Sequence, residues 1–156
     1  MEKIAIFPGS FDPFTVGHES IVRRSINLFD KIIVAVGVHS GKQPLMSSKA
    51  RVDMINEVFR NDEKVSCESF EGLTVDFCRK VNARYMLRGI RTAADFEYER
   101  AMAQINKKML PEVESIILLT SPEHTPVNST IIRDIIRNGG DASQFLPDGI
   151  DIKKYL

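Results

Sequence analysis

Hydrophobic runs and helical repeats alternate along the chain. The run from 31 to 38 (KIIVAVGV) is continuous, as in a strand buried on both faces. The predicted strands are Lys3–Phe7, Lys31–Val38, Val65–Phe70, Tyr85–Arg88 and Val113–Thr120. Between them apolar residues recur at helical spacing. The predicted helices are Gly17–Phe29, one beginning at Ser47 or Ser48, Thr74–Asn82, Ala94–Met109 and Ser129–Asn138.

Each predicted helix has an apolar side that we expect to face a sheet. Helix 94–109 would turn Met102, Ile105 and Met109 inward, and in helix 129–138 the predicted inner residues are Ile131, Ile132, Ile135 and Ile136. Five strands alternating with helices predict an α/β fold, a doubly wound, five-stranded parallel sheet of Rossmann-like type. In such sheets ligands bind beyond the carboxyl ends of the strands.

Composition narrows the class of protein. The 156 residues suit a single domain spanning 1–156, and 43% hydrophobic with 27% charged residues is typical of globular chains. Lysine plus arginine and aspartate plus glutamate number 21 each, so no net field favours nucleic acid or an anionic membrane as partner. Cys67 and Cys78 do not form a CxxC pair, and the chain starts without an apolar leader. We therefore expect reduced thiols and a cytoplasmic location.

The loop after the first predicted strand concentrates unusual residues. It reads PGSFDPFTVGH from 8 to 18, and a helix begins at its end. Glycine lets the backbone approach a ligand, and helix N-termini attract anions. His18 lies in the first helical turn, where its ring could reach the same anion. The alternative is that His18 only caps the helix, but the whole loop favours an anion site.

Arginines and helix starts mark two further loops. Arg88 and Arg91 straddle Gly89 after the fourth strand, as a phosphate clamp would, although they could instead be surface residues paired with nearby carboxylates. The run NSTIIR from 128 to 133 predicts a hydroxyl N-cap and a second anion site, or an ordinary cap. Lys42 is a further candidate cation, and taken alone it is a solvated loop lysine.

Other catalytic motifs are not matched. The run from 37 to 42 (GVHSGK) is one residue short of a P-loop, no GxGxxG follows a strand, and no Ser/His/Asp set stands out. The three histidines are scattered, so we expect no metal ion held by protein ligands.

Two segments together identify a family resemblance. Residues 9–18 resemble the (H/T)xGH signature of nucleotidyltransferases related to class I aminoacyl-tRNA synthetases, and 128–133 resemble their C-terminal signature. RGIR at 88–91 with DFEYE at 95–99 is similar to the phosphopantetheine adenylyltransferase family. The resemblance implies transfer of the adenylyl group of ATP to 4′-phosphopantetheine with Mg²⁺, which gives dephospho-coenzyme A and pyrophosphate without a covalent intermediate. It also implies a homohexamer that coenzyme A can inhibit, with Mg²⁺ held mainly through the ATP phosphates.

The resemblance also implies roles for individual residues. His18 would stabilise the transition state, and the other residues at the reacting phosphates would be Lys42, Arg88, Arg91 and Ser129. The residues at the acceptor would be Ser10, Lys42, Thr74 and Arg88. Those at ATP would be Ser10, Phe11, His18, Gly89, Ile90, Arg91, Glu99, His124, Thr125, Pro126, Val127, Asn128, Ser129 and Thr130.

Two alternatives remain open. A sister transferase would use another phosphorylated acceptor, such as nicotinamide mononucleotide, or CTP in place of ATP. A non-catalytic nucleotide sensor on the same fold would need no transition-state group, so the joint presence of His18, Lys42, Arg88 and Arg91 argues against it.

Overall fold

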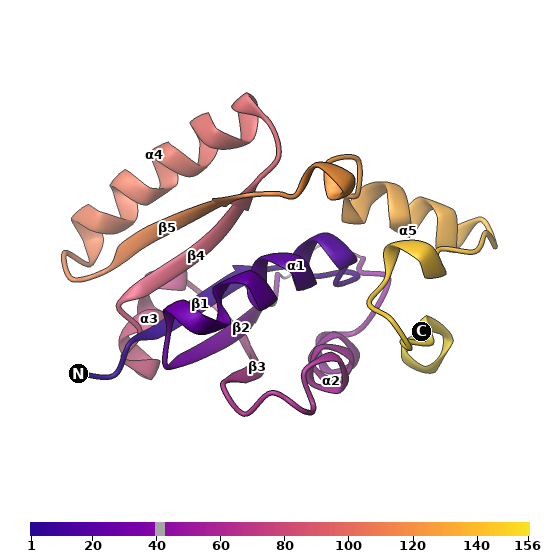
Figure 1. Cartoon of the computed structure of the whole chain (residues 1–156), viewed down its shortest axis with the longest axis horizontal. Helices are drawn as coiled ribbons and strands as arrows, with labels where there is room; N and C mark the ends of the chain where they lie inside the picture. Colours follow the sequence, from indigo (N-terminus) through magenta and orange to yellow (C-terminus); the bar gives the residue numbers. More distant parts are fainter. Residues whose placement is uncertain (40–42) are drawn as a thin grey trace.

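The computed structural model describes residues 1–39 and 43–156. Its centre is a five-stranded sheet of order β3-β2-β1-β4-β5, in which every pairing is parallel (Figure 1). The strands are β1 (Ile4–Gly9), β2 (Lys31–Gly37), β3 (Val65–Phe70), β4 (Tyr85–Ile90) and β5 (Glu114–Leu119). The predicted α/β class with a doubly wound parallel sheet is confirmed.

Five α-helices connect and cover the strands. They are α1 (Val16–Ser25), α2 (Ser48–Val58), α3 (Thr74–Val81), α4 (Ala93–Met109) and α5 (Ser129–Arg137). Short 3₁₀ turns lie at Ile26–Leu28, Pro122–His124, Ser143–Phe145 and Ile152–Tyr155. Among the described residues, no helix has the length and apolar character needed to cross a bilayer.

Alternating residues of β1 pack into two separate hydrophobic cores. On one face Ala5 and Phe7 pack with residues of α1, α2 and α5. On the other face Ile6 packs with α3 and with the chain that follows α4. Period-two alternation therefore gives a helical layer on each side of the sheet, as a doubly wound fold requires.

Side-chain caps determine where several helices begin. Thr15, Ser47, Thr92 and Asn128 each accept a hydrogen bond from a backbone N–H of the first turn. Ser47 is thus the cap of α2, one of the two predicted serines. The hydroxyl cap predicted for α5 is wrong, because the amide oxygen of Asn128 accepts from Ile131 N at 2.9 Å.

The inner face predicted for helix 94–109 is also wrong. Met102, Ile105 and Met109 of α4 are 41%, 54% and 41% exposed, whereas Glu99 and Asn106 are buried. The two polar residues face the sheet because β4 offers them partners: Glu99 contacts Arg88, and Asn106 Nδ2 donates to Met86 Sδ at 3.5 Å. In α5 Ile132 is buried as expected, but Ile131 is 55% exposed.

The strands β1 and β4 pair over a shorter length than their neighbours. Only Ala5 with Tyr85 and Ile6 with Met86 are paired, whereas β1 and β2 are paired from Ile4 to Gly9. The strand order reverses between β1 and β4. Their carboxyl ends therefore separate at the switch point where α/β sheets bind ligands.

We expect burial on β2 to dominate stability. Ile33 is 2% exposed in the centre of the sheet, so Ile33→Ala should lower the free energy of unfolding by about 2–5 kcal/mol in urea titrations. The matched control is Ile131→Ala on the surface of α5, which should change it by less than about 0.5 kcal/mol. Equal losses in both variants would contradict this packing.

Candidate active site

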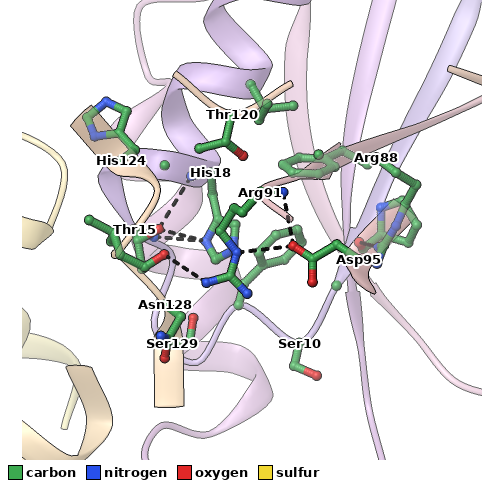
Figure 2. A pocket seen from close by; sticks show the side chains of 18 of the residues that line it. Ser10, Thr15, His18, Arg88, Arg91, Asp95, Thr120, His124, Asn128 and Ser129 are labelled. Atoms are coloured by element: carbon green, nitrogen blue, oxygen red, sulfur yellow. Dashed lines mark hydrogen bonds and ion pairs between the residues drawn. The ribbon is translucent and has the colours of Figure 1, made fainter. Parts of the chain in front are cut away.

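Two clefts open where β1 and β4 separate, and they share one wall. The first has a volume of about 460 Å³ and the second about 340 Å³. The residues that line both are Pro8, Gly9, Ser10, Arg88, Tyr98 and Glu99. Figure 2 shows the first cleft, into which side chains from β4, α1, α4 and the loop before α5 converge. A ligand in either cleft would meet the other at Ser10 and Arg88.

The first cleft collects most of the residues predicted to hold ATP. These are Ser10, Phe11, His18, Gly89, Arg91, Glu99, His124, Val127, Asn128 and Ser129. Four predicted ATP residues do not line it, namely Ile90, Thr125, Pro126 and Thr130. Ile90 is buried at 8% exposure, and Thr130 Oγ1 is hydrogen-bonded to Arg133. Lys42 lies outside the described residues.

The second cleft runs from the shared wall along β4 and α4 and carries apolar and polar surface in similar measure. Thr74, the residue predicted to line the acceptor arm, lies at its wall at the start of α3. Phe70, Met86 and Met102 add apolar surface from β3, β4 and α4, and Asn106 adds an amide. Apolar side chains with a few polar groups among them are typical of small-molecule binding clefts.

His18 both caps α1 and lines the first cleft. Its Nδ1 accepts a hydrogen bond from the backbone N–H of Thr15 at 3.0 Å, and its own backbone N–H donates to Thr15 Oγ1 at 3.4 Å. The capping role is therefore observed, and the ring also lines the cleft, where its contact with an anion stays a prediction. Because Nδ1 is an acceptor, the proton of the neutral ring resides on Nε2.

The surroundings of His18 favour its neutral form. The rings of Phe11 and Phe14 lie with centroids 5.0 and 5.4 Å from the imidazole. Burial, followed by the positive charges of Arg88 and Arg91, lowers the pKa of His18 from 6.5 to about 3. At neutral pH the ring is an uncharged donor whose single N–H is directed by the cap.

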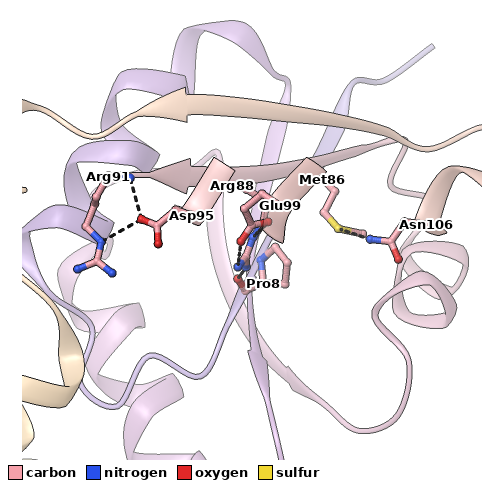
Figure 3. A network of polar contacts seen from close by, with 7 residues as sticks. All are labelled: Pro8, Met86, Arg88, Arg91, Asp95, Glu99 and Asn106. Carbon is pink, nitrogen blue, oxygen red and sulfur yellow. Dashed lines mark hydrogen bonds and ion pairs between the residues drawn. The ribbon is translucent and has the colours of Figure 1, made fainter. Parts of the chain in front are cut away.

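Arg88 spans the gap between the two separating strands. Its guanidinium donates to both carboxylate oxygens of Glu99, at 2.9 and 2.7 Å, and to the carbonyl oxygen of Pro8 (Figure 3). The side chains of Arg88 and Glu99 are 30% and 10% exposed. This bidentate pair holds the arginine in one orientation at the wall common to both clefts.

Arg91 is held from two sides. Its backbone N–H donates to Asp95 Oδ2 at 2.9 Å, and its Nε lies 3.5 Å from the same oxygen. Its guanidinium also donates to the carbonyl of Val127 at 3.5 Å. Both arginines thus pair with carboxylates, as one reading of the sequence expected, and both still line the first cleft.

Several lining residues were not predicted from the sequence. Thr120 follows β5, and its place at a strand end is a signal that could have found it. Tyr98 lies at the shared wall but is 64% exposed, and nothing in its local sequence separates it from a surface tyrosine.

The described residues place no group of three or more His, Cys, Asp and Glu side chains where they could hold a metal ion. Within the first cleft, the carboxylates of Asp95 and Glu99 form ion pairs with Arg91 and Arg88, respectively. Arg88, Arg91 and Arg133 supply N–H groups of the first cleft that could bind phosphate oxygens.

Comparison with known proteins gives the site its context. A family described as cytidylyltransferase-like matches residues 6–135. A phosphopantetheine adenylyltransferase of Flavobacterium psychrophilum is 48% identical over 149 residues, 96% of this chain and 98% of the relative. One from Leptospira biflexa is 45% identical over 99% of both chains.

Solved structures show the same fold in more distant proteins. A bifunctional NMN adenylyltransferase/ADP ribose pyrophosphatase from Francisella tularensis superposes with a TM-score of 0.74 at 20% identity, over 98% of this chain and 47% of that longer one. A putative nicotinate-nucleotide adenylyltransferase from Vibrio parahaemolyticus gives 0.72 at 18% identity, over 94% and 88%. With near full-length relatives at 45–48% identity, the chain belongs to the phosphopantetheine adenylyltransferase family.

Proposed function

We propose that this enzyme joins ATP and 4′-phosphopantetheine by a single in-line displacement, giving dephospho-coenzyme A and pyrophosphate. The observation that supports the proposal most strongly is the shared wall: a cleft lined by Arg88, Arg91 and Arg133 and a second cleft that extends to Phe70, Met86 and Met102 meet at Ser10 and Arg88. ATP would occupy the first cleft and the pantetheine arm the second. Their phosphates would then lie side by side, and transfer would need no protein nucleophile.

The bond changes follow from this placement. An oxygen of the acceptor phosphate attacks the α-phosphorus of ATP, and the bond from that phosphorus to the α–β bridging oxygen breaks. A phosphate monoester is largely a dianion at neutral pH, so its oxygen attacks without a general base. Pyrophosphate carries away the electron pair of the broken bond.

The chain's own groups would stabilise charge along this path. Neutral His18 would donate its Nε2–H to an oxygen of the α-phosphate as negative charge grows there. Arg91 and Ser129, which line only the first cleft, would lie at the pyrophosphate, while Ser10 and Arg88 at the shared wall would face the acceptor phosphate. The role proposed for Lys42 in orienting the acceptor rests on the family resemblance alone.

Mg²⁺ would enter as the counter-ion of the ATP phosphates, a proposal supported by the pairing of Asp95 and Glu99 of the first cleft with arginines. Coenzyme A contains both an adenylyl group and a pantetheine arm, so we propose that it competes at the same two clefts. The two cysteines are free and buried, which supports the proposed cytoplasmic location.

A sister transferase acting on nicotinamide mononucleotide is the second candidate. Its acceptor is compact and has no long arm to cover Phe70, Met86 and Met102. The deciding assay is pyrophosphate release from MgATP with either acceptor. Release with phosphopantetheine alone supports the proposal; release with nicotinamide mononucleotide alone overturns it, and ATP binding without release in either case supports the nucleotide sensor.

His18→Ala should lower kcat by roughly 100- to 1,000-fold, because one preorganised donor to developing charge is lost. Pyrophosphate release at saturating substrates measures it, and circular dichroism checks that the variant is folded. A loss under about tenfold with intact ATP binding would remove the proposed role of His18.

The neutral state of His18 should appear in the pH dependence of stability. The pKa of His18 is about 3 in the folded protein and 6.5 in the unfolded chain, so between these values only the unfolded chain binds a proton at this residue. The stability that the neutral ring contributes is therefore fully present above pH 6.5 and is lost as the pH falls towards 3. Between about pH 7 and pH 5 the wild type should lose up to about 1.4 kcal/mol per pH unit more than His18→Asn, measured by urea unfolding. Equal pH dependences would contradict a neutral His18 ring in the folded protein.

We propose that the chain assembles as a homohexamer through the exposed apolar side of α4 and the end of β5. Ile105 and Met109 are 54% and 41% exposed there, and Leu119 is 70% exposed. Ile105→Asp should shift the mass measured by light scattering from a hexamer to smaller species, whereas Arg60→Asp, on the turn after α2, should not. A wild type that is monomeric at micromolar concentration would contradict the assembly.

A further inference from the structure

The loop between β1 and α1 is held by side chains from other elements. Four of its backbone carbonyl oxygens accept hydrogen bonds from such side chains. Arg88 donates to the carbonyl of Pro8, and Arg51 donates to that of Ser10. Arg133 donates to the carbonyl of Asp12, and the Ser129 hydroxyl donates to that of Pro13. Three of these donors line the first cleft. Arg51 alone lines neither cleft and has no role in the function proposed above.

Arg51 is a buried arginine whose partners are carbonyl groups. It lies in the first turns of α2 and is 6% exposed. Its Nη1 donates to Ser10 O at 2.8 Å, and its Nε donates to Ser47 O at 3.4 Å. Among the described residues no carboxylate lies within 4.0 Å of it. Burying a guanidinium charge carries a desolvation penalty, and the hydrogen bonds to the two carbonyl oxygens offset part of it.

Asp12 makes the reciprocal connection. Its carboxylate is 6% exposed and accepts from the backbone N–H groups of Leu45 and Met46, at 2.8 and 2.9 Å. The first loop therefore reaches the segment before α2 through Asp12, and α2 reaches back through Arg51. Burial lowers the pKa of Arg51, and the nearby Asp12 carboxylate opposes that shift.

The backbone between these two anchors is strained. Phe11 has φ of +50°, in the left-handed region that a residue with a Cβ disfavours. The carbonyls on either side of it, from Ser10 and Asp12, are the ones bound by Arg51 and Arg133. Such strain persists where the surroundings over-determine the conformation, and it is frequent at functional sites.

We propose that Arg51 is a positioning residue for adenylyl transfer. By holding the Ser10–Phe11 peptide from the buried side, it keeps the exposed Ser10 side chain at the boundary of the two clefts. This inference rests on the proposed function, because the Ser10 hydroxyl matters to rate only if two substrate phosphates meet there. Arg51 touches neither substrate and acts through Ser10.

The first test separates positioning from stability. Arg51→Met should lower kcat by roughly 100-fold, because misplacement of a group by about 1 Å costs this much. Arg51→Lys should retain more activity, since an ammonium can reach Ser10 O but does not reproduce the arginine fork. The control is Ile55→Val in the next turn of α2, where the side chain is fully buried and has no hydrogen-bonding group. It should lower the thermal midpoint and change kcat by less than about twofold.

The second test asks whether Arg51 acts through Ser10. In a Ser10→Ala background, Arg51→Met should cost about fivefold or less, because residues that act as a unit are not additive. If the kcat loss of the double variant instead equals the product of the losses of Arg51→Met and Ser10→Ala, the proposal is overturned. An Arg51→Met enzyme with kcat within threefold of wild type would also overturn it. If Arg51→Met does not fold, Arg51→Lys is carried through the same comparison.

A third readout does not depend on activity. Hydrogen exchange of the peptide covering 8–14 should be faster in Arg51→Met or Arg51→Lys than in wild type, and unchanged in Ile55→Val. Unchanged exchange in both Arg51 variants would overturn the inference. Absence of pyrophosphate release by the wild type would instead overturn the proposed function, so the two failures are distinguishable.

Discussion

The separation of β1 from β4 after two paired positions is the constraint on which the site depends. Beyond Ile6 and Met86 the two strands no longer pair with each other, although each stays paired with its outer neighbour, and the sheet opens between its two halves. Arg88 occupies the opening and binds the Pro8 carbonyl together with both oxygens of Glu99. The same guanidinium that joins the two strands thus forms the wall between the two clefts.

The first loop obtains its shape from tertiary contacts and not from regular secondary structure. A left-handed residue with a side chain costs about 1–2 kcal/mol, whereas a hydrogen bond to a charged group contributes about 1.5–3 kcal/mol. The hydrogen bonds from Arg51 and Arg133 to the carbonyls on either side of Phe11 are therefore of the same order as its strain. β4 and α2 each supply one contact to this loop and α5 supplies two, so the shape of the loop depends on all three elements.

Strand positions, helix positions and the motif loops were predictable because each depends on local pattern. The continuous apolar run became β2, and the residues around His18, Arg88 and Asn128 came together because they follow parallel strands. Periodicity could not tell which side of α4 faces the sheet, since Glu99 and Asn106 are drawn inward by partners on β4. Nor could it find Arg51, because a lone arginine in a helix is usually exposed.

The central claim is that two phosphates meet at the shared wall and react directly. The most direct measurement uses ATP made chiral at the α-phosphorus with sulfur and oxygen isotopes, followed by determination of the configuration in the dephospho-coenzyme A product. A single in-line displacement between the two clefts predicts inversion at phosphorus. Retention would show two successive displacements, hence a covalent enzyme intermediate, and would contradict the account.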